Sequence, residues 1–170
     1  MNKKLVEAIN DQINAEMFSA YLYQAMAADM EFKGYQGVAN WFTVQAQEEM
    51  VHAMKFYRFL MERGEKVVLK ALDTPPSTWK DLKTVFSASL EHEKYITKRI
   101  HDLFKLAQKS GDYATEIMLH WFITEQVEEE ANANEILGKL ELLGNAPNGA
   151  YLLDRELGAR VPLFTMPAGE

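Results

Sequence analysis

Residues 41–53, WFTVQAQEEMVHA, carry apolar positions three and four residues apart, the spacing of one face of an α-helix. Glu49 and His52 fall on that same face, where a helix packed in a bundle normally places apolar side chains. Residues 121–133, WFITEQVEEEANA, repeat the pattern, with Glu129 in the place of Glu49. Two such helices with a matching polar interruption predict an all-α bundle built around a buried polar site.

Composition narrows the class of protein. The chain has 170 residues, of which 48% are apolar, so we expect one domain over residues 1–170 with a full core. The absence of cysteine excludes disulfides, thiolate zinc sites and iron–sulfur clusters. A net charge of −7 argues against binding to nucleic acid and is compatible with cations as ligands. No apolar run approaches the length of a membrane span or a signal peptide, so we expect a cytoplasmic protein without a membrane partner.

Helical periodicity runs through most of the chain and is interrupted at a few places. Gly34 and Gly37 bracket one break, and residues 73–78 form a loop before a helix start marked by Thr78 and Asp81. Gly144 to Pro147 ends the fourth long helix, and Pro162 and Pro167 lie in a tail. The predicted helices span 3–33, 36–63, 79–109, 112–143 and, for a short fifth helix, 148–158, followed by a tail over 159–170.

The lengths of the connections predict the topology. The first two long helices are joined by a few residues, as are the last two, so each pair forms an antiparallel hairpin. The linker between the hairpins has about 15 residues and can reach about 50 Å. A helix of about 28 residues is roughly 42 Å long, so the linker can cross the whole bundle. The second and third helices are therefore expected to run parallel.

A glutamate interrupts the apolar seam of each long helix at a similar height. Counted from the helix starts, Glu16, Glu49, Glu93 and Glu129 lie roughly 20–26 Å along their helices, near the middle of the bundle. No seam contains lysine or arginine, so four buried carboxylates lack an internal counter-charge. Bound metal is the simple source of that charge, and oxygen-rich ligation with one imidazole suits iron or manganese and also admits zinc.

Other interpretations of these residues stay open. A single glutamate in a seam is more often hydrogen-bonded or extended to solvent than a ligand, and a single histidine is more often a core residue. A purely structural bundle without metal would use them in that way. Five such residues at one height, without lysine or arginine, favour a metal centre.

The internal repeat suggests two metal positions facing each other. The first would have three ligands: Glu16, Glu49 and His52. The second would have Glu93 and Glu129, with Gln126 nearby and Asn132 where a second histidine would stand. Glu49 could bridge the two. Because the second position has fewer strong ligands, we expect its metal to bind more weakly and to be the one that leaves.

The stretches QINAEMFSAYLY, QAQEEMVHA, LEHEKYITKRIH and WFITEQVEEEA together resemble the non-haem ferritins of bacteria and archaea, over nearly the full length. The resemblance implies a ferritin-like four-helix bundle with one long crossover and a short fifth helix. It implies a ferroxidase centre whose ligands are Glu16, Glu49, His52, Glu93 and Glu129, with Gln126 beside them and Tyr23 nearby. Glu48, Glu125 and Glu128 match positions that, with Glu129, form a third iron site in bacterial ferritins.

The same resemblance implies a function. We expect a homo-oligomeric shell of 24 subunits that oxidises ferrous iron with dioxygen, at two irons per subunit with a third site, and stores ferric mineral. Bacterioferritins and rubrerythrins have a second Glu-x-x-His motif, whereas this chain has Gln126-x-x-Glu129. Met50 occupies a place comparable to the haem ligand of bacterioferritins, but we interpret it as a packing residue and predict no haem. Another carboxylate-bridged di-metal oxidase or a catalase on the same bundle is the alternative.

Two further features, a set of histidines and the short fifth helix, are expected to lie outside the metal layer. His92, His101 and His120 are interpreted as surface or packing residues. The short fifth helix has an apolar side with Tyr151, Leu152, Leu153 and Leu157, and either packs at a symmetry axis of the shell or caps its own bundle.

Overall fold

Five helices make up the secondary structure of the residues that the computed structural model describes, which are 1–144, 146 and 148–165. They are α1 (Lys3–Phe32), α2 (Gln36–Glu62), α3 (Leu82–Ser110), α4 (Tyr113–Leu143) and α5 (Gly149–Leu157). Each predicted helix is present, with boundaries that differ by at most a few residues. The predicted roles of Asn145, Pro147 and Pro167 fall outside the described residues.

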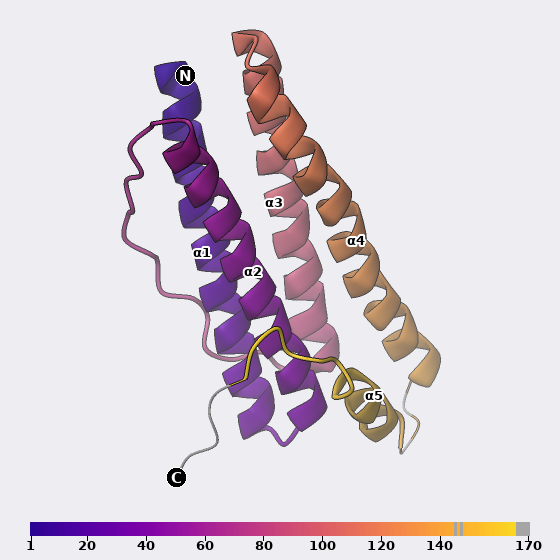
Figure 1. Ribbon diagram of the computed structural model, residues 1–170. Helices are drawn as coiled ribbons and strands as arrows, with labels where there is room; N and C mark the ends of the chain where they lie inside the picture. Colours follow the sequence, from indigo (N-terminus) through magenta and orange to yellow (C-terminus); the bar gives the residue numbers. More distant parts are fainter. Residues whose placement is uncertain (145, 147, 166–170) are drawn as a thin grey trace.

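The four long helices lie side by side, and α5 lies at one end of them (Figure 1). Helices α1 and α2 form one antiparallel hairpin, and α3 and α4 form the other. The linker over residues 63–81 runs back along the outside of the bundle, from the end of α2 to the start of α3 (Figure 1). The parallel course of α2 and α3 predicted from the linker length is confirmed. Of the helices in the described part of the chain, none combines the length and apolar character that crossing a membrane requires.

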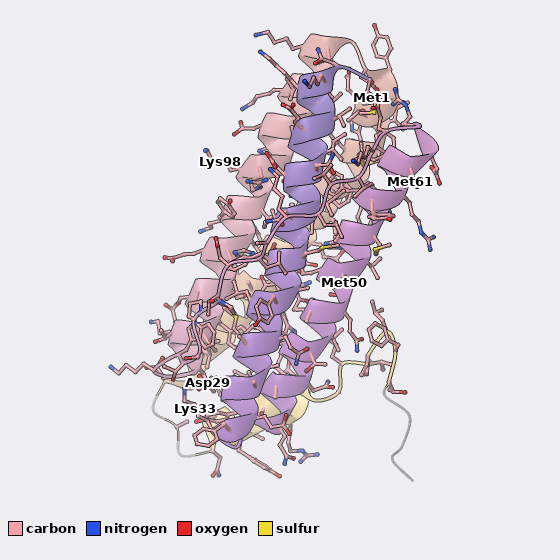
Figure 2. The ribbon with its side chains drawn as sticks, turned by 90° about the vertical axis from the view of Figure 1, so that its left-hand side faces the viewer. Met1, Asp29, Lys33, Met50, Met61 and Lys98 are labelled. Carbon is pink, nitrogen blue, oxygen red and sulfur yellow. The ribbon has the colours of Figure 1, made fainter. Side chains whose placement is uncertain are left out.

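The linker is held at both ends by side chains of α1. Near its start, buried Asn10 accepts a hydrogen bond from the Val68 N–H at 2.7 Å and donates to the Lys66 carbonyl at 3.3 Å. Near its end, Asp29 and Lys33 lie close together at the foot of α1 (Figure 2). The Trp79 N–H donates to Asp29 at 2.9 Å.

These contacts correct the predicted start of the third long helix. Trp79 is buried, its N–H is bonded to Asp29, and its carbonyl accepts from the Lys33 ammonium group. Because its N–H and carbonyl groups are hydrogen-bonded to Asp29 and Lys33, Trp79 does not begin a helix as predicted. The N-cap is Asp81, whose side chain accepts from the Thr84 N–H at 2.8 Å, and the predicted Thr78 cap is wrong.

Gly37 also differs from its predicted role. Gly34, with a φ of +88°, makes the turn between α1 and α2, whereas Gly37 lies inside α2. A Cβ atom at Gly37 would lie 1.7 Å from the carbonyl oxygen of Asp154 in α5. The glycine is therefore needed for close packing of two helices. Leu153 and Leu157 of α5 are buried at this end of the bundle, while Tyr151 and Leu152 are exposed.

The apolar core is divided into two clusters along the bundle. One cluster contains Phe42 and Phe86, and the other contains Phe56 and Phe122. Buried polar residues of the four long helices, including Gln45 and Glu49, belong to neither cluster. The fold thus places a polar layer between two apolar ones.

Candidate metal centre

The four glutamates and the histidine predicted as ligands are all withdrawn from solvent. Glu16, Glu49 and Glu93 are each 1% exposed, Glu129 is 5% exposed and His52 is 3% exposed. Each long helix supplies one carboxylate, because the glutamate occupies a seam position among residues that are themselves buried. Among the described residues, no lysine or arginine forms an ion pair with any of the four.

The hairpin of α1 and α2 brings three of these residues together. Glu16, Glu49 and His52 each offer one ligand atom, and these atoms lie within 4.8 Å of one another. His52 Nδ1 is 3.6 Å from Glu49 Oε2. The Oε2 atoms of Glu16 and Glu49 are buried and have no hydrogen-bond partner among the described residues. Unsatisfied buried carboxylate oxygens are costly, and a cation between them would satisfy both.

Neutral donors position the two carboxylates of the other hairpin. Tyr23 OH donates to Glu93 Oε1, and Gln126 Nε2 donates to Glu93 Oε2 at 3.0 Å. Gln45 Nε2 donates to Glu129 Oε2 at 2.7 Å. The tyrosine predicted to lie near the site therefore touches a predicted ligand. Glu93 thus accepts from two side chains and Glu129 from one, whereas Glu16 accepts from Gln12 alone and Glu49 accepts no hydrogen bond from the described residues.

A second group of potential ligand atoms shares the histidine. His52, Glu125 and Glu129 offer atoms within 4.8 Å of one another, and His52 Nε2 is 4.0 Å from Glu125 Oε1. Of the four residues predicted for the third site, Glu125 and Glu129 belong to such a group among the described residues, whereas Glu48 and Glu128 do not. Glu48 is paired with Arg160 at 2.6 Å, and Glu128 is exposed.

The carboxylate layer is arranged to hold protons when no cation is present. Burial raises the pKa of Glu16 to about 7 and that of Glu129 to about 8. Burial and the charges of Glu93 and Glu16 also raise the pKa of Glu49 well above its ordinary range. Burial lowers the pKa of His52 to about 4, so its imidazole is neutral and able to act as a ligand.

Several residues near the layer were not predicted from the sequence. Buried Gln12 donates to Glu16 at 2.8 Å and accepts from Arg99 Nε at 3.0 Å. Gln12 lies one helical turn before Glu16, a spacing that could have revealed it. Arg99 does not occupy a seam position, so the periodicity of the apolar residues could not predict its contact with Gln12. Lys55, which lies 3.3 Å from the centroid of the Trp121 ring, is also outside the pattern.

The remaining predicted residues lie outside the layer. His101 and His120 are exposed, and His92 bonds Ser19 at 2.7 Å beside the layer. Met50 is 41% exposed and lines an apolar groove of about 610 Å³ between α1 and α2, so it is not a core packing residue of this chain. Figure 2 shows Met50 about midway along α2.

The internal repeat has matching geometry in its two copies. The rings of Trp41 and Phe42 meet edge to face at 5.0 Å, and those of Trp121 and Phe122 do so at 4.9 Å. A cation covers each tryptophan, namely Arg160 over Trp41 and Lys55 over Trp121. The two copies therefore share the contact between the two rings and the cation over the tryptophan, although Trp41 is buried and Trp121 is exposed.

Comparison with known proteins places this arrangement in a family. A family model described as Ferritin-like domain matches residues 6–143. The bacterial non-heme ferritin of Staphylococcus aureus (strain USA300) is 39% identical over 160 residues, covering 94% of this chain and 96% of the relative. That of Staphylococcus haemolyticus (strain JCSC1435) is 40% identical with the same coverage. The crystal structure of an open pore ferritin from the hyperthermophilic archaeon Archaeoglobus fulgidus superposes with a TM-score of 0.93, at 46% identity, over 95% of this chain and 99% of that one. The chain belongs to the ferritin family.

Proposed function

We propose that this protein stores iron and that its buried carboxylate layer is a ferroxidase centre. The observation that carries the proposal is that the Oε2 atoms of Glu16 and Glu49, buried beside a neutral His52, have no hydrogen-bond partner in the described part of the chain. Membership of the ferritin family and the names of the bacterial relatives support iron as the substrate. Oxygen ligands with one imidazole suit ferrous iron.

Two ferrous ions would bind in positions of unequal strength. The first would be held by Glu16, Glu49 and His52, and the Oε2 atoms of the two glutamates accept no hydrogen bond from the described residues. The second is held by Glu93 and Glu129, with Gln126 nearby and with Glu49 as a bridge. Because Glu93 and Glu129 already accept hydrogen bonds from neutral donors, the second ion replaces existing interactions and binds more weakly.

In the proposed reaction each ferrous ion gives up one electron and dioxygen accepts the pair. The carboxylates stabilise the higher charge of the ferric product, while the buried layer limits access of bulk water. Tyr23 positions Glu93 through its hydroxyl group, and donation of an electron is the second role that we propose for it.

Outward from the layer, the shared group of His52, Glu125 and Glu129 offers the next position for a cation. We propose that a third iron binds on this side, with Glu48 and Glu128 contributing once Arg160 leaves Glu48. Ferric ions would then pass from the layer to a mineral inside a homo-oligomeric shell. We further propose that the shell has 24 subunits and that the exposed side of α5 forms a contact between them. We also propose that the protein is located in the cytoplasm.

The test is the oxidation of ferrous iron by the metal-free protein in air, followed by ultraviolet absorbance. Wild type should show a fast phase that saturates near about two irons per chain, as a two-metal site requires. Glu49→Ala should lose this phase, whereas Glu62→Ala, which removes an exposed carboxylate from the same helix, should keep it.

Three results would redirect the proposal. Equal slow oxidation by wild type and Glu49→Ala would show that the layer is not a working iron site. Fast oxidation without retention of iron in an assembled shell would favour a different di-metal oxidase or a catalase. A Glu49→Ala variant that is more stable and otherwise unchanged would favour a structural bundle.

A further inference from the structure

The residues after α5 form a strap, defined here as residues 159–165, that passes back across α2 (Figure 1). Two polar side chains on the surface of α2 hold its backbone. Asn40 Nδ2 donates to the Arg160 carbonyl at 2.8 Å. Gln47 Oε1 accepts from the Leu163 N–H at 2.8 Å, and Gln47 Nε2 donates to the Phe164 carbonyl at 2.9 Å. The strap is therefore attached to the helix that carries Glu49 and His52.

The side chain of Arg160 makes the strap's charged contact. Its Nη2 atom is 2.6 Å from Glu48 Oε2, and its guanidinium carbon is 5.0 Å from the centroid of the Trp41 ring. The side chains of Arg160 and Glu48 are 23% and 26% exposed, so the pair is partly desolvated. A charge-assisted hydrogen bond combined with a cation–π contact at such a position is stronger than an ordinary surface ion pair.

This contact lies beside the outer side of the carboxylate layer. Glu48 precedes the layer residue Glu49 and is repelled by the charge of Glu128. His52, which is 3% exposed and makes no hydrogen bond among the described residues, has its Nε2 atom 4.0 Å from Glu125 on the same side. Burial and the charges of Glu128 and Glu48 raise the pKa of Glu125, so Glu48 lies near this group. A cation that leaves the layer on this side therefore comes close to a carboxylate that is already paired with a guanidinium group.

We propose that the strap is a cation-responsive latch, in which Arg160 is the internal cation on Glu48 and an arriving metal cation displaces it. The proposal rests on the proposed function only in taking a multivalent cation as the cargo that reaches this side. Binding of the cation and docking of the strap exclude each other, so each must weaken the other by the same factor. The strength of the contact between Arg160 and Glu48 therefore sets the cation concentration at which residues 159–165 leave α2.

Hydrogen exchange of the assembled full-length protein, read by mass spectrometry, tests the latch at named atoms. The amides of Leu163 and Phe164 both donate to Gln47 and report directly on docking, while Pro162 has no amide hydrogen. In metal-free wild type we expect both amides to be protected. Arg160→Gln should make them exchange severalfold faster, Arg160→Lys should retain part of the protection, and Arg155→Gln, which removes an exposed charge from α5, should resemble wild type.

Terbium(III), which is not oxidised or reduced by the protein, supplies the cation. Its addition should speed exchange of the two amides in wild type and change little in Arg160→Gln, where the strap is already free. Terbium luminescence should show about fivefold to tenfold tighter binding to Arg160→Gln than to wild type or Arg155→Gln.

Unchanged protection in Arg160→Gln, unchanged protection at saturating terbium, or equal terbium affinity of the two proteins would each overturn the latch. Absence of terbium binding on this side would overturn it as well. The fast oxidation of iron in the buried layer is measured separately, and Arg155→Gln, at an exposed position of α5, should keep it. Loss of that phase from wild type would reject the proposed function and leave the terbium result to decide on the latch.

Discussion

Gln45 of α2 holds Glu129 of α4 through a hydrogen bond of 2.7 Å, while the other amide atom of Gln45, Oε1, is buried without a partner among the described residues. A neutral donor thus positions a carboxylate that forms no ion pair with a lysine or arginine among the described residues. The Oε1 atom of Gln45 meets no hydrogen-bond donor among the described residues, so the free-energy cost of burying it is offset only if a cation or water approaches it.

The first prediction concerns this bond. Gln45→Leu should destabilise the metal-free protein by about 1–3 kcal/mol, because Glu129 would lose its donor in a buried layer. It should also weaken the second metal position more than the first, as measured by cation titration. Gln108→Leu, at an exposed position of α3, should leave both quantities near wild type. Equal weakening of both positions would contradict the assignment of Glu129 to the second.

A second prediction follows from the shifted pKa values. Burial raises the pKa values of Glu16 and Glu129 from their ordinary value of 4.5 to about 7 and about 8, so the folded protein holds protons that the unfolded chain has lost. Their stabilisation is complete below about pH 4.5 and is lost as the pH rises through about 7 and about 8. Burial lowers the pKa of His52 to about 4, so the contribution of His52 to stability is complete above about pH 6.5 and is lost as the pH falls towards 4.

The Tm of the metal-free protein should therefore fall between about pH 6.5 and about pH 9. Glu129→Gln, or a saturating cation, should remove part of the decline. A Tm that is constant or rising over this interval would show that the carboxyls are ionised in the folded protein.

The third prediction separates two roles of Tyr23. As a positioning residue it donates to Glu93, so Tyr23→Phe should slow the fast oxidation phase by about tenfold, the effect of losing one hydrogen bond to a charged group. The ring packing should be preserved, and the affinity of the first metal position should be unchanged. Stopped-flow absorbance measures the rate, and electron paramagnetic resonance of wild type reports any tyrosyl radical. An unchanged rate would show that Tyr23 acts only as an aromatic packing residue.

The fourth prediction tests the linker. Asn10→Ala should cost about 1–3 kcal/mol of unfolding free energy, because two hydrogen bonds between α1 and the linker would be lost, one from the Val68 N–H and one to the Lys66 carbonyl. Hydrogen exchange should increase over residues 65–70. Asn14→Ala, one helical turn further along α1 and less buried, is the matched control. Equal effects of the two substitutions would show that the linker does not depend on Asn10.

The fifth prediction uses two glycines. Gly37→Ala should displace α5, because the added Cβ atom would meet the Asp154 carbonyl oxygen and disturb the bond from Val38 N–H to Asp154 Oδ1. Gly138→Ala has free space around it inside α4 and should instead stabilise the protein by about 0.5–1 kcal/mol. Denaturation and the oligomeric state of both variants measure the contrast. Normal assembly and stability of Gly37→Ala would mean that α5 contributes little.

The helices, the crossover and the grouping of Glu16, Glu49 and His52 could be predicted from sequence because each depends on periodicity along one helix or on the length of one linker. The start of α3 could not, since Trp79 is held out of the helix by Asp29 and Lys33 of a distant segment. Arg160 was missed for a related reason. Its partner Glu48 lies more than a hundred residues earlier, and only the return of the chain across α2 brings the two together.

The crossover between α2 and α3 also bears on how the centre forms while the protein folds. Contacts within each hairpin are local in sequence, so the hairpins are expected to form as separate cooperative units before the linker closes between them. Glu16, Glu49 and His52 belong entirely to the first hairpin, whereas Glu93 and Glu129 arrive with the second. A growing chain should therefore be able to chelate one cation before its second hairpin has been synthesised, and should acquire the capacity for paired oxidation only when the two hairpins dock.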